Sequence, residues 1–159
     1  MDNENPIINI KNNEEITPRK RSIKINAYDL SNGMVKLIPQ LANIDAVWHT
    51  CLEIDETEYF FQSGIKRSKK FEIYGKPLKT FDLGFTEMSD EEVFLIIENL
   101  NSKYNEQTYH ILDNNCNHFV DEIVKLMMGN EFGVPEEIMS VMDKARDNEM
   151  VKMFLGMKR

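Results

Sequence analysis

The start of a helix is indicated by residues 109–119, which read Tyr109-His110-Ile111-Leu112-Asp113-Asn114-Asn115-Cys116-Asn117-His118-Phe119. Asn114 or Asn115 can cap a helix, which would place Cys116 in its first turn. Unpaired amides at a helix start favour the thiolate form of a cysteine, and a neighbouring imidazolium favours it further. The same amides can bind the oxyanion of a tetrahedral intermediate. The stretch therefore predicts a thiol nucleophile, Cys116, at the start of a helix.

The helix that begins here is expected to run from about Asn115 to Met128, and Gly129 suits its C-terminal end. Residues three and four apart form its apolar stripe, namely Cys116, Val120, Ile123 and Met127. This stripe should face the sheet, so Cys116 should point toward the strands. His118 lies near the opposite side of the helix, which makes it a poor candidate for a catalytic base.

The base that we expect for Cys116 is His49, which lies in a strand predicted over residues 46–54. Side chains alternate between the two faces of a strand. One face therefore carries Val47, His49 and Cys51, and the other carries Trp48, Thr50 and Leu52. We expect the helix to place Cys116 against the face that carries His49.

The rest of the chain predicts an α+β fold, with an antiparallel sheet packed against helices. Further strands are expected at 22–27, 57–62, 71–74 and 80–83, the second of them pairing with the strand of His49. Residues 35–41 fit either a short strand or a helical turn. Ser89 and Glu92 form the capping box of a helix, and another helical region follows Pro135.

Composition limits the possible functions. The chain has 159 residues, which suits one domain, and its net charge of −8 argues against nucleic-acid binding. No apolar run approaches the roughly 20 residues that a membrane-spanning helix needs. Residues 1–13 lack the apolar stretch of a signal peptide, so a cytoplasmic and possible nuclear location is expected. Residues 1–20 are predicted to be a disordered extension, and residues 21–159 the folded domain.

Each candidate residue also has a purely structural explanation. Cys116 could be a buried packing cysteine, and His49 a hydrogen-bonded histidine of the core. For Cys51, on a central strand, packing is the preferred interpretation. Two Cys and two His, in the pairs His49-x-Cys51 and Cys116-x-His118, nominally make a zinc set. Helix residues i and i+2 diverge, however, so we expect neither a metal nor another cofactor.

Four segments together resemble the PPPDE family of desumoylating isopeptidases. They are residues 27–33 (AYDLSNG), 47–50 (VWHT), 58–65 (EYFFQSGI) and 114–119 (NNCNHF). The resemblance implies a circularly permuted papain-like fold, in which the histidine strand precedes the cysteine helix. It implies a dyad of Cys116 as nucleophile and His49 as base, without a third member that we can name. The lysine-rich residues between 64 and 81 depart from the family pattern.

The resemblance also implies an activity, which is removal of SUMO-like or ubiquitin-like modifiers from conjugated proteins by acyl transfer. Two alternatives stay open: a protein S-acyl (palmitoyl) thioesterase that uses the same dyad, and a non-catalytic adaptor that binds such modifiers. The thioesterase requires an apolar channel near Cys116. The residues expected along the substrate groove are Trp48, Asn115, Asn117 and Phe119. Family members can be homodimers, so a second copy is a possible partner.

Overall fold

The computed structural model of the chain describes residues 18–157, and its side chains to residue 153. Five antiparallel strands form one sheet in the order β4-β3-β2-β1-β5. The strands are β1 (Arg21–Asp29), β2 (Trp48–Ile54), β3 (Thr57–Phe61), β4 (Ile65–Lys69) and β5 (Lys79–Thr86). Together with the helices, this arrangement confirms the predicted α+β class. Residues 1–17, the greater part of the predicted disordered extension, lie outside the described residues.

The strand predicted at residues 71–74 is wrong, because this segment forms turns. Phe71 has a φ of 65°, in the left-handed region, which is incompatible with an extended strand. The fourth strand is instead β4, whose charged residues suit the exposed edge of a sheet. The segment between β1 and β2 contains two 3-10 turns, η1 (Met34–Leu37) and η2 (Pro39–Leu41), so helical turns form there and not a strand.

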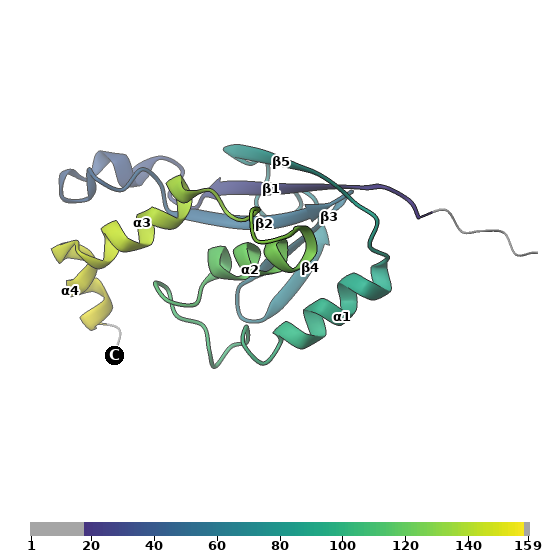
Figure 1. Cartoon of the computed structure of the whole chain (residues 1–159). Coiled ribbons are helices and arrows are strands. Elements are labelled where there is room, and N and C mark those ends of the chain that lie inside the picture. The colour runs from purple at the N-terminus through teal and green to yellow at the C-terminus, as the bar shows by residue number, and fades with distance from the viewer. Residues whose placement is uncertain (1–17, 158–159) are drawn as a thin grey trace, which may run out of the picture.

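Two helices, α1 (Asp90–Leu100) and α2 (Cys116–Met128), pack on one face of the sheet (Figure 1). The main core lies between this face and α2. It contains Ile23, Ile25, Leu52 and Ile54 from the strands and Phe119, Val120, Ile123 and Val124 from α2. The predicted stripe of α2 is buried from Cys116 to Met127, as expected. Burial of this stripe therefore fixes where the first turn of α2 lies.

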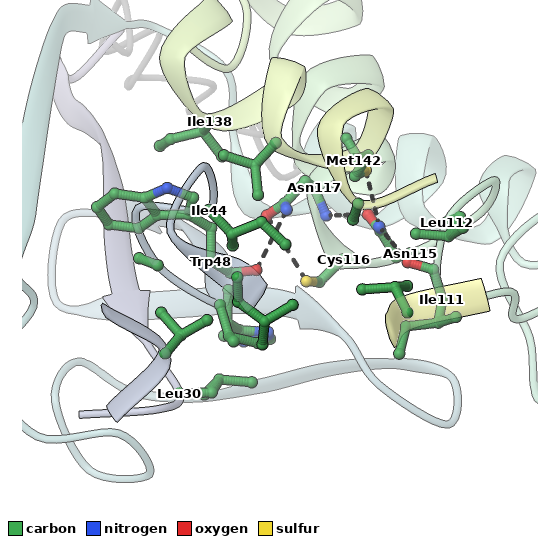
Figure 2. Close-up of a pocket in the computed structure, with 18 of the residues that line it drawn as sticks. Leu30, Ile44, Trp48, Ile111, Leu112, Asn115, Cys116, Asn117, Ile138 and Met142 are labelled. Atoms are coloured by element: carbon green, nitrogen blue, oxygen red, sulfur yellow. Dashed lines mark hydrogen bonds between the residues drawn. The ribbon is translucent and has the colours of Figure 1, made fainter. Parts of the chain in front are cut away.

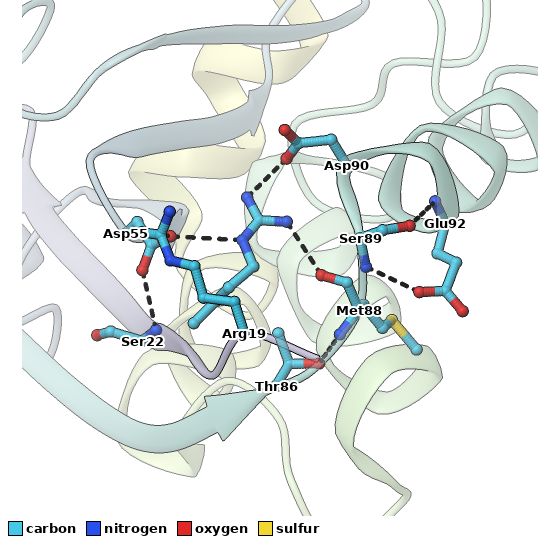
Figure 3. Close-up of polar contacts among 9 residues, drawn as sticks. Arg19, Ser22, Asp55, Thr86, Met88, Ser89, Asp90 and Glu92 are labelled. Carbon is cyan, nitrogen blue, oxygen red and sulfur yellow. Dashed lines mark hydrogen bonds and ion pairs between the residues drawn. The ribbon is translucent and has the colours of Figure 1, made fainter. Parts of the chain in front are cut away.

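A cluster of polar contacts joins the start of β1 to the β2–β3 turn and to α1 (Figure 3). Arg21 donates to Asp55 (3.4 Å) and to the carbonyl of Met88 (3.1 Å), and it pairs with Asp90 at 2.7 Å. The predicted capping box of α1 is present, because Ser89 and Glu92 exchange hydrogen bonds of 2.8 and 3.2 Å. These contacts hold the end of the sheet that lies away from Cys116.

The opposite face of the sheet carries buried polar groups. The carboxylate of Glu58 is fully buried and accepts from the amide of Asn26 (2.8 Å), the hydroxyl of Tyr28 (2.5 Å) and the backbone N–H of Phe71 (3.3 Å). The last bond ties the turn segment that follows β4 to the sheet. This face also carries a small aromatic cluster in which Tyr74 packs on Tyr28.

The last two helices, α3 (Glu136–Arg146) and α4 (Glu149–Met157), lie beside the turns η1 and η2 (Figure 1). Val141 of α3 packs with Val35 and Ile44, and the side chain of Asn148 donates to the carbonyl of Gln40 at 2.7 Å. Within residues 18–157, no helix is both long enough and apolar enough to cross a membrane.

Candidate active site

The start of α2 contacts β2 at the point where β2 has parted from β3. The ladder between β2 and β3 extends only from the turn to the pair Leu52–Tyr59, so β2 has no strand partner on that side near Thr50. The side chain of Asn117 bonds to β2 in this region. Its Nδ2 donates to the carbonyl of Trp48 (3.2 Å), and its Oδ1 accepts from Thr50 Oγ1 (2.8 Å). The first turn of α2 is therefore joined to β2 by one side chain, which bonds to a backbone carbonyl and to a side-chain hydroxyl of that strand.

The helix begins where the sequence predicted, with Asn115 as its N-cap. The side-chain oxygen of Asn115 accepts from the backbone N–H of Asn117 (2.9 Å) and His118 (3.3 Å). Its amide donates to the carbonyl of Ile111 (2.8 Å) and contacts the sulfur of Met142 in α3 at 2.9 Å. Figure 2 shows this cap between α2 and α3. His118 completes a capping box through Nδ1, so its ring serves the helix end and not the thiol.

Cys116 is the first residue of α2, and its side chain is buried. Burial raises the pKa of the thiol to about 11, and the nearby backbone N–H groups of Thr50, Asn117 and Cys116 itself offset part of this rise. The thiol is therefore protonated near neutral pH, and it needs a base in order to react. The N–H groups around the sulfur are suitable donors for an oxyanion that forms next to it.

The expectation that α2 packs on the His49 face of β2 is wrong. The helix covers the face of Thr50 and Leu52, because the apolar side chains of the sheet that match its stripe lie there, whereas the other face holds the buried polar groups. Cys116 nevertheless lies close to β2, because the backbone N–H of Thr50 is near enough to its sulfur to lower the pKa of the thiol. Cys116 and His49 line one cavity.

His49 is buried among aromatic side chains. Its ring lies 4.3 Å from that of Tyr74 and 6.0 Å from that of Phe60, measured between centroids. Its Nε2 atom is 3.5 Å from the sulfur of Cys51. Burial lowers the pKa of His49 to about 4, so the imidazole is neutral at neutral pH and able to accept a proton.

The cavity that Cys116 and His49 share has a volume of about 670 Å³, and most of its lining is apolar (Figure 2). Its walls come from the segment between β1 and β2, from the residues before α2, and from α3 and α4. They include Leu30, Ile44, Ile111, Leu112, Val141 and Met142. A cavity of this size is in the range of small-molecule sites.

Three of the four residues predicted for the groove, Trp48, Asn115 and Asn117, line this cavity. Phe119 does not, because its ring is fully buried and packs against Tyr104 and Phe61 in the core. It lies three residues after Cys116, on the buried side of α2, which the helical period could have indicated.

Sequence reasoning missed two residues of the site. They are Tyr74 and Gln62, which line the cavity, whereas the sequence predicts both as strand residues only. Tyr74 has no signal in the sequence, since it reaches His49 only through the turns after β4, whereas Gln62 lies within residues 58–65, one of the segments that resemble the family. Among the described residues, no group of three or more His, Cys, Asp or Glu side chains is arranged to hold a metal ion.

Comparison with known proteins gives a consistent result. Residues 21–159 match the family model described as the PPPDE putative peptidase domain. Human desumoylating isopeptidase 1 is 26% identical over 134 residues, which cover 77% of this chain and 80% of that protein. The Xenopus laevis protein of the same name is 25% identical over 129 residues, or 74% and 76% of the two chains. A DeSI-like protein of Arabidopsis thaliana is 40% identical over 47 residues, which are 30% of this chain and 21% of that protein.

Proposed function

The chain belongs to the PPPDE putative peptidase family, whose fold is a permuted papain-like one, and from this premise we propose that it is a cysteine peptidase. In this proposal Cys116 is the nucleophile and His49 is the base. The observation that supports it is the position of the Cys116 sulfur, which lies in the first turn of α2 near the backbone N–H groups of Thr50 and Asn117. His49, neutral at physiological pH, lines the same cavity.

The reaction is acyl transfer in two steps. His49 takes the proton of the Cys116 thiol as the sulfur attacks the carbonyl carbon, and the N–H groups near the sulfur bind the oxyanion. The protonated His49 then donates its proton to the leaving amine, which departs as a thioester forms on Cys116. In the second step His49 activates a water molecule that hydrolyses the thioester and restores the free thiol.

The substrate class that we propose is a protein conjugated to a SUMO-like or ubiquitin-like modifier. Two of the relatives are named desumoylating isopeptidases, and each shares about a quarter of its aligned residues with this chain. A Gly-Gly tail has no side chains to clash in a narrow approach to a buried thiol. The attacked carbonyl would be that of the terminal glycine, and the leaving group the amine of a lysine.

A second candidate is a thioesterase that removes acyl groups from cysteine residues. The observation that favours it is the apolar lining of the cavity beside Cys116, where an acyl chain could lie. The chemistry is the same, except that the leaving group is a thiol. The two candidates therefore differ in the substrate that is turned over and not in the residues that act.

The first experiment measures alkylation of Cys116 by iodoacetamide between pH 6 and 9, by mass spectrometry, in the wild type and in His49→Ala. A thiol with a pKa of about 11 reacts slowly at pH 7 without help. We expect the alkylation rate of Cys116 at pH 7 to fall at least about tenfold in His49→Ala. This corresponds to a rise of about 1.4 kcal/mol in the activation free energy. Equal rates in the two proteins would contradict the role of His49.

The second experiment identifies the substrate. SUMO-type and ubiquitin-type isopeptide reporters and an acyl-thioester reporter are incubated in parallel with the wild type and with Cys116→Ser. Turnover of an isopeptide reporter that is lost in Cys116→Ser supports the peptidase, and turnover of the thioester alone supports the second candidate. Binding of a modifier that persists in Cys116→Ser, with no turnover by the wild type, would favour an adaptor.

A further inference from the structure

His49 has one hydrogen-bonding contact among the side chains of residues 18–153, and it is with a second cysteine. The sulfur of Cys51 lies 3.5 Å from Nε2 of His49, within range for a hydrogen bond that involves sulfur. The two residues are neighbours on one face of β2, since side chains two apart on a strand point the same way. Cys51 is fully buried at the centre of the sheet, so its sulfur is held in a fixed place.

The contact with Cys51 determines which ring nitrogen can serve Cys116. A histidine that acts on a thiol through one nitrogen is usually oriented by a partner at the other nitrogen. Here Nε2 is directed at Cys51, which leaves Nδ1 as the nitrogen available to Cys116. No carboxylate or amide among the described residues lies at hydrogen-bond distance from the His49 ring. The position that a third catalytic residue usually occupies, beside the second ring nitrogen, is therefore occupied by the thiol of Cys51.

We propose that Cys51 is a positioning residue, whose sulfur accepts a hydrogen bond from Nε2–H of His49 so that Nδ1 faces Cys116. The inference rests on the proposed function, in which Cys116 and His49 react together. It differs from a packing role, because it requires an acceptor atom at the position of the Cys51 sulfur.

A hydrogen bond to Cys51 would stabilise the protonated form of His49 that the reaction requires. When His49 has taken the proton of Cys116, both of its ring nitrogens carry hydrogen and both require an acceptor. Burial disfavours the charged imidazolium, and an acceptor at Nε2 offsets part of that cost. Burial also raises the pKa of Cys51, so this thiol stays neutral and does not compete as a nucleophile.

Tyr74 supports the ring of His49 from another side. Its ring packs against His49 at 4.3 Å and against Tyr28 at 5.2 Å. Glu58 anchors the arrangement, because it accepts hydrogen bonds from the hydroxyl of Tyr28 and from the backbone at the start of the segment that carries Tyr74. The titratable groups beside the imidazole are Cys51, Tyr74 and Tyr28, with Glu58 behind Tyr28, and Cys116 lines the same cavity.

The test compares Cys51→Ala with Cys51→Ser in the full chain. Both substitutions have small side chains, but only serine supplies an acceptor near Nε2. We expect Cys51→Ala to lower kcat about tenfold with KM changed less than about twofold, and Cys51→Ser to recover most of the loss. The alkylation rate of Cys116 at pH 7 should fall in Cys51→Ala in the same proportion. In both variants Cys116 is the sole thiol of the chain, so bulk thiol assays report on it alone.

Controls separate this inference from its premise. If alkylation of Cys116 depends on His49 but is unchanged in Cys51→Ala, the positioning role fails and the dyad stands. If alkylation is independent of His49, the dyad itself fails. Faster turnover in Cys51→Ala than in the wild type would also overturn the inference, since Cys51 would then hold His49 away from Cys116.

Two variants of Tyr74 test whether its ring also holds His49 in position. Tyr74→Phe keeps the ring against His49, so its kcat should stay well above that of Tyr74→Ala. Tyr74→Ala removes the ring and should lower kcat about as much as Cys51→Ala does. Thermal melting of each variant shows whether the fold persists, and the alkylation assay does not require a known substrate.

Discussion

Asn117 carries the attachment of α2 to β2, and Asn117→Ala should therefore be strongly destabilising. The side chain is almost fully buried, and it makes one hydrogen bond to the backbone of Trp48 and one to the hydroxyl of Thr50, and its oxygen also accepts from the Cys116 thiol at 3.6 Å. Each bond contributes about 1 kcal/mol, and leaving a buried polar group without its partner costs about 1–3 kcal/mol more. Since Thr50 is fully buried, we expect the free energy of unfolding to fall by about 3 kcal/mol.

A double-mutant cycle with Thr50→Val tests this reasoning. Valine keeps the shape of threonine without the hydroxyl, so in the double variant no buried donor is left at residue 50. The two substitutions should then be non-additive by about 1–2 kcal/mol. Equilibrium unfolding in urea, with an unchanged m-value, measures all four proteins. Asn101→Ala is the control, because its side chain makes a single exposed bond to Glu98, and it should cost less than about 0.5 kcal/mol.

Two results would refute this account of the site. One is a loss of less than about 1 kcal/mol in Asn117→Ala, which would mean that the bonds to β2 contribute little. The other is strict additivity with Thr50→Val, which would mean that the two side chains do not interact. In either case the start of α2 would be held by its cap and its apolar stripe alone.

Three further predictions concern substitutions of His49, Glu58 and Phe119. Burial lowers the pKa of His49 from 6.5 to about 4, so the unfolded chain binds the proton at a higher pH than the folded chain does. As pH falls from 6.5 to 4, the free energy of unfolding of the wild type should therefore fall by about 3 kcal/mol relative to that of His49→Asn, as measured by urea unfolding. Glu58→Ala leaves the hydroxyl of Tyr28 and the N–H of Phe71 without their acceptor, and it should cost about 3 kcal/mol and speed hydrogen exchange in residues 70–78. Phe119→Ala should cost about 3–5 kcal/mol in thermal or urea unfolding, because the ring lies in the core.

Much of the site could be predicted from the sequence. An asparagine cap at residue 114 or 115 and the stripe of α2 are local patterns, so they indicate that Cys116 lies in the first turn of the helix, and the structure has Asn115 as the cap. Alternation along β2 also placed His49 and Cys51 on one face, which their contact bears out. These inferences depend only on helix and strand periods, which neighbouring residues determine.

The remaining features depend on tertiary contacts. Every residue of β2 after Trp48 is buried, so no alternation of apolar and polar residues indicated which face α2 would cover. The edge strand β4 has a charged sequence without the apolar alternation that predicts a strand. The apolar residues Phe71 and Ile73 led to the incorrect prediction of a strand at residues 71–74. Both of those apolar side chains turn out to be exposed, because the turn holds Phe71 in a left-handed conformation.

The attachment of α2 to β2 has a consequence for the stage of folding at which the proposed pair of Cys116 and His49 can form. The hydrogen bonds of Asn117 to Thr50 and Trp48 join positions 67 and 69 residues apart in the chain. Contacts of such long sequence separation form slowly, because a large loop must close before they stabilise anything. The strand ladder of β2 and the first turn of α2 can each appear earlier, from local contacts alone. Reactivity of Cys116 that depends on His49 should therefore emerge only with the slow, long-range phase of refolding.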